Sequence, residues 1–307
     1  MACFGLYCGK TLLFKNSSTE IYGECGACPR GQRTNEEKYC QPCTEPPELY
    51  DWLYLGFMAL LPLVSHWLCI EWNSKKSGSS GVFFQQVSAL LECSMAAVVT
   101  LLVSDPPGTL SIYACRVRML SDWYTMLYNP SPDYITTLHC TQEAVYPLYT
   151  IVFTYYAFCL VFMMLLRPFL VKKIQWSLYM PNPFESIYTA LYFFPGLAVL
   201  QAVAGGLLYY AFPYIVLVAS LANLAVFLVF AKIESYSDLI RKDRLLVLFN
   251  HWFLHAFGLI ALSRENQLEQ DLLLLFLVPV PVLFYFFTTK FTKPSRIISE
   301  GAKGNWI

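Results

Sequence analysis

Cysteine is the residue type whose spacing in this chain most clearly suggests chemistry. Six of the eleven cysteines lie within the first 43 residues, and four of these form two C-x2-C units, Cys25/Cys28 and Cys40/Cys43, separated by eleven residues. Two such units could bind zinc in a reducing compartment, and one alone could be a redox dithiol. We favour structural disulfides in an oxidising compartment, because a tail of about 50 residues is too small to hold a core without cross-links. Their pairing stays open, since six cysteines allow 15 combinations.

Two further cysteines share one later loop, which again gives an even number of disulfide candidates. The candidates are Cys3, Cys8, Cys25, Cys28, Cys40, Cys43, Cys115 and Cys140. Three others, Cys69, Cys93 and Cys159, fall inside apolar segments. A cysteine in such a segment behaves as a small apolar packing residue, so we expect these three to pack rather than react.

Ionisable side chains inside apolar segments form the second set of candidates. His251 and His255 are four residues apart, which places them on one face of a helix at a spacing that a metal site or a proton relay could use. Glu92 lies near the middle of another apolar segment, and His66 lies toward the end of the first. A transporter or an intramembrane enzyme could be built from Glu92, His251 and His255. The alternative is interhelical hydrogen bonding, worth about 1 kcal/mol per contact.

We favour the hydrogen-bonding interpretation because the chain contains no HExxH unit, no paired-aspartate arrangement and no GxSxG-type nucleophile. We therefore expect no catalytic residue, no metal ligand and no cofactor, and predict that the protein is not an enzyme. The formal net charge is zero, from 21 basic and 21 acidic residues, so there is no basic field that would attract nucleic acid.

The elements that must position these residues are membrane helices. Hydrophobic residues make up 56% of the chain and charged residues only 14%, against about a quarter charged in soluble domains. The stretch 186–231 contains no Asp, Glu, Lys or Arg, and as one helix it would be about 69 Å long, twice what a bilayer requires. We expect it to fold back at Tyr209–Tyr214, where aromatic residues meet Pro213. The predicted spans are 52–70, 82–104, 144–166, 186–208, 213–231, 245–263 and 272–289.

The predicted fold class is therefore all-α. It is a polytopic membrane protein with seven transmembrane helices over 52–289, a small cysteine-rich tail over 1–51 and a polar tail over 290–307. The segment 110–128 is also apolar, but Arg116, Arg118 and Asp122 near its middle would each cost a few kcal/mol at mid-membrane. We assign 105–143 to an extramembrane loop.

Charge distribution predicts the orientation. The loops 71–81, 167–185 and 232–244 and the tail from Lys290 carry 13 of the 21 basic residues, whereas the opposite loops carry three. By the positive-inside rule, the N-terminus is lumenal or extracellular and the C-terminus cytosolic. The only glycosylation acceptor, Asn16, then lies in the lumenal tail.

One cytosolic segment resembles a kinase-docking peptide. It has a basic cluster followed by apolar residues at alternate positions, a pattern that mitogen-activated protein kinases bind through an acidic patch and an apolar groove. The candidate docking residues are Arg241, Lys242, Arg244, Leu246 and Leu248. The alternative, which we favour, is ordinary basic flanking of the sixth span, with Leu246 in lipid.

Several longer segments resemble a known family. Those that carry the resemblance are Leu6–Phe14, Cys28–Thr34, Glu48–Phe57, Leu120–Tyr134 and Glu143–Tyr149. They are similar to the c-Jun N-terminal kinase-associated membrane proteins over nearly the whole chain. The resemblance implies a seven-pass protein of the endoplasmic reticulum that recruits proteasome subunits and a membrane-anchored RING ubiquitin ligase. It also implies binding to c-Jun N-terminal kinase and control of how long that kinase stays active.

The expected function is accordingly that of a non-enzymatic adaptor in the lipid bilayer. Such a protein would support degradation of misfolded proteins and the unfolded protein response by bringing partners together at the membrane. Two alternatives remain: a seven-span receptor that senses a ligand through the cysteine-rich tail, and a transporter that uses the intramembrane glutamate and histidines.

Overall fold

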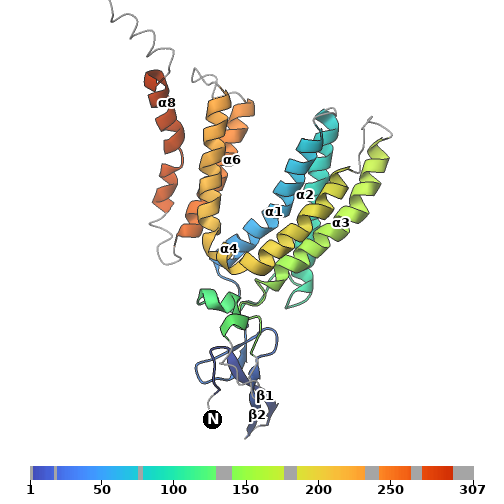
Figure 1. Cartoon of the computed structure of the whole chain (residues 1–307), viewed down its shortest axis with the longest axis vertical. Coiled ribbons are helices and arrows are strands. Elements are labelled where there is room, and N and C mark those ends of the chain that lie inside the picture. Colours follow the sequence, from blue (N-terminus) through green and yellow to red (C-terminus); the bar gives the residue numbers. More distant parts are fainter. Residues whose placement is uncertain are drawn as a thin grey trace, which may run out of the picture. The chain divides into compact units, whose positions relative to one another are not determined.

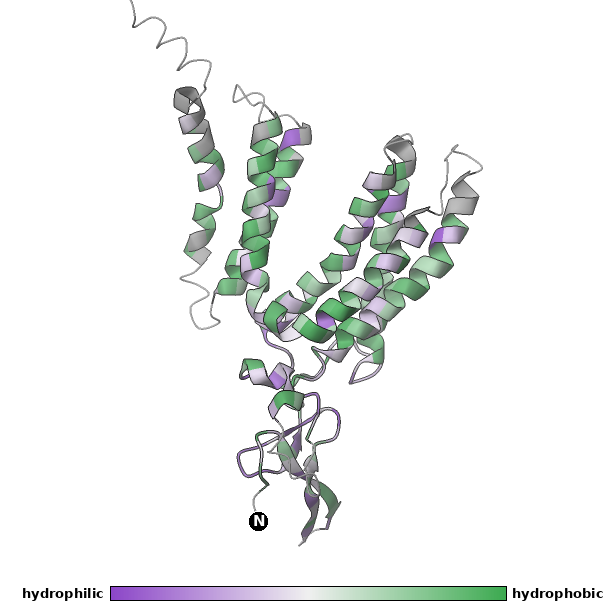
Figure 2. Cartoon of the chain, viewed as in Figure 1, coloured by the Kyte–Doolittle hydropathy of each residue, from purple (hydrophilic) through white to green (hydrophobic). Residues whose placement is uncertain are grey.

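The computed structural model of the chain describes residues 3–16, 19–74, 79–128, 140–175, 185–231, 242–263 and 272–292. It divides into two compact units, Met1–Tyr210 and Ala211–Ile307. Figure 1 shows the elements in chain order, and Figure 2 shows that apolar residues dominate the helices while polar residues are concentrated in the N-terminal part.

Two small antiparallel sheets begin the first unit. Strand β1 (Cys8–Lys15) pairs with β2 (Glu20–Ala27), and β3 (Gln32–Thr34) pairs with β4 (Cys40–Pro42). Gly9 allows β1 to lie against the second sheet, because a Cβ there would be 2.9 Å from the sulfur atoms of Cys28 and Cys40. Gly31 has φ +76°, a backbone conformation that favours glycine, just before β3.

The tail does not form a domain of its own. Residues 3–16 and 19–48 combine with the described parts of the loop between the second and third helices, 104–128 and 140–149, to form what we call the cysteine-rich module. Ala114 donates a backbone hydrogen bond to Glu45 (2.9 Å), and Cys115 donates one to Tyr146 (2.6 Å). In agreement with the prediction, 110–128 is no spanning helix and contains only two short 3-10 helices, η1 (Leu120–Trp123) and η2 (Thr125–Tyr128).

Three long helices and the first part of a fourth complete the first unit, and the remainder of the fourth belongs to the second. They are α1 (Leu49–Ser74), α2 (Ser79–Val103), α3 (Thr150–Gln175) and α4 (Glu185–Ala231). Helices α1, α2 and α3 pack against one another, and the cysteine-rich module lies at the end of the bundle where α1 and α3 begin (Figure 1). Helix α3 begins six residues later than predicted. The apolar residues 144–149 pack inside the module instead of facing lipid as part of the helix.

The described residues contain four helices long and apolar enough to cross a membrane: Leu49–Trp72, Val82–Val103, Thr150–Leu170 and Ile187–Leu228. Shorter apolar helices occur at Val247–Leu262 and Leu275–Phe284. The architecture is thus mostly helical with four candidate membrane spans among the described residues, while seven separate spans stay a prediction.

The predicted fold-back lies within helix α4. Residues 209–214 are helical, and the boundary between the two compact units falls there. Pro213 cannot donate to the carbonyl of Tyr209, four residues earlier. The Tyr50 hydroxyl donates to that carbonyl instead, at 2.6 Å. The proline therefore leaves no unsatisfied carbonyl in an apolar region, and helical backbone can continue through it.

The second unit contains the remainder of α4, α6 (Lys242–Leu262), the 3-10 helix η4 (Leu272–Leu277) and α8 (Val280–Thr292). Its apolar cluster centres on Leu224 and Leu228 of α4. A Cβ at Gly258 of α6 would be 2.7 Å from the Leu217 side chain, so this glycine permits close approach of α6 to α4. The predicted span 272–289 is divided into η4 and α8, with Pro279 between them.

Candidate functional site

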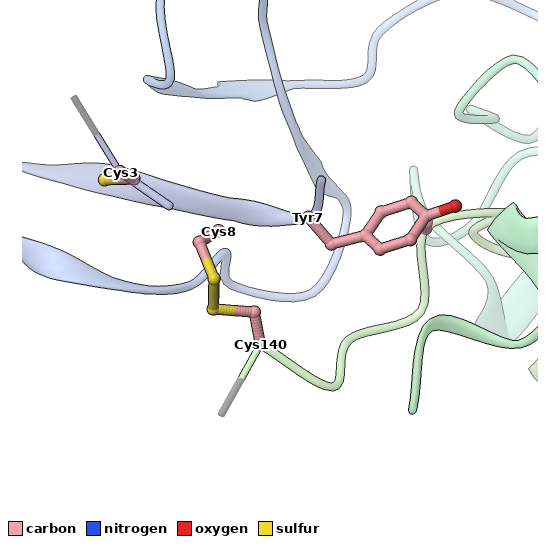
Figure 3. Packing of buried hydrophobic residues seen from close by; sticks show 5 residues of the cluster. Cys3, Tyr7, Cys8 and Cys140 are labelled. Atoms are coloured by element: carbon pink, nitrogen blue, oxygen red, sulfur yellow. A yellow bond between two sulfur atoms is a disulfide. The ribbon is translucent and has the colours of Figure 1, made fainter. Parts of the chain in front are cut away.

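All eight cysteines predicted to form disulfides are cross-linked, and the structure gives the pairing that the sequence left open. Two bonds stay within the tail, and two join the tail to the loop after α2. The pairs are Cys3–Cys25, Cys8–Cys140, Cys28–Cys40 and Cys43–Cys115. Figure 3 shows the Cys8–Cys140 bond between the two segments.

Neither C-x2-C unit pairs internally. Cys25 and Cys28 have different partners, and so do Cys40 and Cys43. A redox dithiol would need its two cysteines to bond with each other, and a zinc site would need free thiolates. Both alternative interpretations are therefore inconsistent with the structure. Cys69, Cys93 and Cys159 are free, and the last two are buried between α2 and α3.

Asp122 is the polar centre of the cysteine-rich module. Its carboxylate accepts hydrogen bonds from Arg33 (2.9 Å) and the Tyr7 hydroxyl (3.0 Å), and from the backbone N–H groups of Arg118 (2.8 Å) and Met119 (3.1 Å). The ion pair with Arg33 is mostly buried, with side-chain exposures of 13% and 1%. Burial, reinforced by the nearby carboxylate, raises the pKa of Tyr7 to about 12. Asp122 therefore joins the tail to η1.

A second polar contact joins the module to the start of α3. Arg30 forms an ion pair with Glu143 (3.9 Å) and donates to the Thr150 hydroxyl (3.0 Å). Glu143 in turn accepts hydrogen bonds from the Thr150 backbone and side chain, at 2.9 and 3.1 Å, and so caps the helix N-terminus. Burial raises the pKa of Glu143 despite these hydrogen bonds.

An aromatic cluster joins the module to the helices. We call Tyr50, Tyr54, Trp123, Tyr149 and Tyr209 the aromatic junction; ring centroids of Trp123 lie 5.6 Å from Tyr54 and 5.2 Å from Tyr209. Two tyrosine hydroxyls of the junction also donate hydrogen bonds.

Tyr54 donates to Gln201 (3.0 Å), and Tyr209 donates to Asp51 (2.6 Å). Gly206 of α4 admits the Trp123 side chain, since a Cβ there would be 2.6 Å from it. The junction thus fixes η1 against α4 as well as α1.

Glu92 has a partner that sequence reasoning missed. Arg167, which the prediction assigned to a cytosolic loop, lies inside the candidate span Thr150–Leu170 and is fully buried. Its Nε and Nη2 donate to the two Glu92 oxygens at 3.1 and 2.6 Å, a two-point geometry. Ser88 donates to the same carboxylate (2.9 Å), and His66 of α1 lies 3.4 Å from the Arg167 guanidinium. We call Glu92, Arg167, His66 and Ser88 the buried polar cluster.

One sequence signal could have identified Arg167. It is flanked by apolar residues on both sides, Leu165-Leu166 before and Pro168-Phe169-Leu170 after, so a span that ends at residue 166 is shorter than the apolar pattern. An arginine inside such a pattern predicts a carboxylate partner in a neighbouring helix, because charged side chains within spans usually pair.

The two histidines of α6 lie together in the second unit. The His251 and His255 ring centroids are 5.4 Å apart. His251 is buried, and its Nδ1 lies 2.8 Å from the Ser220 hydroxyl and 3.2 Å from the Ser220 carbonyl. Glu92 belongs to the first unit and has its partners there. Among the described residues, no group of three or more His, Cys, Asp or Glu could hold a metal ion.

The candidate docking residues begin α6, except Arg241, which lies outside the described residues. Residues 242–248 are helical, and Leu248 packs against the Leu224 and Leu228 cluster. A docking peptide bound in an extended form would have to release Leu248 and unwind two helical turns. This geometry favours the interpretation of the basic residues as flanking charges.

Asn16 is exposed at the turn that connects β1 to β2. Its backbone N–H donates to the Thr19 carbonyl at 2.9 Å, which closes the turn. Ser17 and Ser18, the rest of the acceptor sequence, lie outside the described residues. The position of Asn16 is accessible to a modifying enzyme.

Comparison with known proteins identifies relatives along nearly the whole chain. The family model described as JNK1/MAPK8-associated membrane protein matches residues 3–294. The human JNK1/MAPK8-associated membrane protein is 72% identical over 305 residues, which cover 99% of this chain and 98% of the relative. The mouse protein of the same name is 71% identical with the same coverage.

A Caenorhabditis elegans protein named as a homolog is 31% identical over 314 residues, covering 96% of this chain and 94% of the relative. No solved structure matches. Because the family model and these relatives cover almost every residue described above, the chain belongs to the JNK1/MAPK8-associated membrane protein family.

Proposed function

We propose that this protein is a non-enzymatic adaptor of the endoplasmic reticulum membrane. It brings c-Jun N-terminal kinase, proteasome subunits and a membrane-anchored RING ubiquitin ligase together, so that misfolded proteins are degraded and the duration of kinase activity is limited. The observation that carries the proposal is the near full-length similarity to a human protein named for its association with JNK1. An adaptor of this kind works by raising the effective concentration of its partners.

The four disulfides support the proposed orientation. Disulfides form and persist in oxidising compartments such as the lumen of the endoplasmic reticulum. The cysteine-rich module, with all four of them, is then lumenal, and the opposite ends of α1, α2 and α3 face the cytosol. Removing Arg167 from the predicted cytosolic charges leaves most of the basic residues on that side.

The state of the Glu92 carboxylate supports an adaptor over a transporter. Both oxygens of Glu92 accept hydrogen bonds from Arg167, and one also accepts from Ser88. A coupled transporter needs ionisable groups that can exchange a substrate or ion. Groups occupied in this way serve helix packing.

A glycosylation and labelling experiment tests the orientation and the partners together. The full-length protein carries a C-terminal biotin ligase, and its Asn16→Gln variant is the matched control. We expect endoglycosidase to shift the mobility of the wild type but not of the variant, and biotin to be attached to c-Jun N-terminal kinase and proteasome subunits. Labelling of lumenal proteins instead would contradict the orientation.

A double substitution tests the adaptor against the transporter. Glu92→Met with Arg167→Met replaces the buried ion pair by apolar side chains, an exchange that is often neutral for stability. We expect degradation of a misfolded membrane client to continue at the wild-type rate when protein levels are equal. Loss of degradation at equal levels would favour a transporter.

A further inference from the structure

A half-open cavity of about 200 Å³ lies among α1, α2 and α3. The lining residues on α1 are Trp52, Leu55, Gly56, Met58 and Ala59; those on α2 are Ala97, Thr100 and Leu101; those on α3 are Ile151, Val152 and Tyr155. All belong to candidate membrane spans. They lie near the ends of the helices that adjoin the cysteine-rich module, because α1 and α3 begin there and α2 ends there.

The lining offers no free hydroxyl to a polar ligand. The Thr100 hydroxyl donates to the Ala96 carbonyl at 2.7 Å, and the Tyr155 hydroxyl donates to the Ala59 carbonyl at 3.0 Å. The other lining side chains are apolar apart from the Trp52 indole N–H. Apolar cavities of comparable size in soluble proteins stay dry and accept hydrocarbon ligands.

Small residues create the space. A Cβ added at Gly56 would meet no atom within 4 Å, so the missing side chain of this glycine opens the cavity. On α1 the lining residues from Trp52 to Ala59 recur over about two helical turns, roughly 10 Å along the helix axis. The cavity therefore extends along α1 for this distance, which is also the direction of lipid chains in a bilayer.

We propose that this cavity binds one acyl chain of a membrane phospholipid. The chain inserts among the three helices from the module side, and the Trp52 indole, in the first turn of α1, donates a hydrogen bond to the ester carbonyl of the lipid. Tryptophan at a span end is suited to that depth, where its ring is apolar and its N–H reaches the polar interface. A sterol fits the lining less well, because its hydroxyl would need a partner where Thr100 and Tyr155 are already bonded.

Photo-crosslinking of the full-length protein in nanodiscs tests the proposal. One set of nanodiscs contains phosphatidylcholine with a diazirine in the acyl chain, and the other contains a diazirine sterol. Gly56→Leu fills the cavity, and Gly196→Leu is the matched control, since a Cβ at Gly196 of α4 also meets no atom within 4 Å and Gly196 does not line the cavity.

We expect phospholipid crosslinks on the lining segments of α1, α2 and α3. Their yield should be roughly tenfold lower in Gly56→Leu, equivalent to about 1.4 kcal/mol of binding, and unchanged in Gly196→Leu. Equal yields in the wild type and Gly56→Leu would overturn the proposal, as would crosslinking by the sterol alone. Ala97→Leu fills the cavity from α2 and provides the same comparison if Gly56→Leu does not fold.

Discussion

The two compact units, divided between Tyr210 and Ala211, differ in the contacts that hold each together. The first contains four disulfides, the Asp122 network, the aromatic junction and the buried polar cluster. The described part of the second contains an apolar cluster around Leu224 and Leu228 and the contact of Ser220 with His251. Covalent and charged contacts fix one arrangement, whereas apolar contacts tolerate repacking. We infer that the first unit is a fixed scaffold and the second is the more adaptable part.

Of the changes that test this difference, a substitution in the buried polar cluster should have the largest effect on stability. Arg167→Met leaves the Glu92 carboxylate buried without its charge partner, and we expect a loss of about 3–5 kcal/mol in the free energy of unfolding. The measurement is unfolding of the purified protein in detergent. The Glu92→Met/Arg167→Met double variant should recover most of the loss. A single variant as stable as the double would show that the ion pair does not hold α2 to α3.

The disulfides give the next largest effect. Cys8→Ser/Cys140→Ser opens a cross-link between residues 132 apart, and Cys28→Ser/Cys40→Ser opens one between residues 12 apart. In the chain-entropy account, longer loops give larger stabilisation, typically about 2–4 kcal/mol per bond. We expect a larger fall in melting temperature for the first pair than for the second. Equal falls would mean that Cys8–Cys140 contributes no more than a local cross-link.

Two single hydrogen bonds, one in each unit, sharpen the comparison further. Tyr50→Phe removes the donor to the Tyr209 carbonyl, and Ser220→Ala removes the hydroxyl beside His251; each should cost about 1 kcal/mol. Hydrogen exchange should increase near residues 209–214 in the first variant and near α6 in the second. Faster exchange throughout the chain after either change would contradict the division into separately stabilised units.

The smallest effect concerns Tyr7 and appears only at alkaline pH. Because the pKa of Tyr7 is raised from 10.0 to about 12, the folded protein favours the neutral phenol. The associated stability is complete below pH 10 and is lost as the pH rises from 10 to about 12. Ultraviolet titration should show one fewer tyrosine ionising near pH 12 in Tyr7→Phe than in the wild type. Identical titration curves would contradict burial of this hydroxyl.

Hydrophobic patterning predicted the membrane class and the positions of α1 and α2 to within a few residues. It could not separate apolar residues in lipid from apolar residues in a protein core, and for that reason 144–149 were assigned to a span. It also could not show that Tyr50 would satisfy the Tyr209 carbonyl and allow helical backbone through Pro213. Such contacts join residues 159 positions apart, and no local pattern encodes them.

The cysteines and charges show the same limit. Counting and sidedness predicted which eight cysteines would be cross-linked, but not that two bonds would join tail to loop. Arg116, Arg118 and Asp122 were correctly interpreted as too polar for a span, yet the role of Asp122 in organising the module depends on Tyr7 and Arg33 from the distant tail.

The Cys8–Cys140 bond also constrains the timing of synthesis. Cys8 leaves the ribosome 132 residues before its partner, a delay of roughly 7–26 s at 5–20 residues per second. During that interval α1 and α2 are synthesised, because both helices lie between the two cysteines. The Cys3–Cys25 and Cys28–Cys40 bonds can close within the tail during that time, whereas the Cys8 thiol has no partner until both helices have been synthesised.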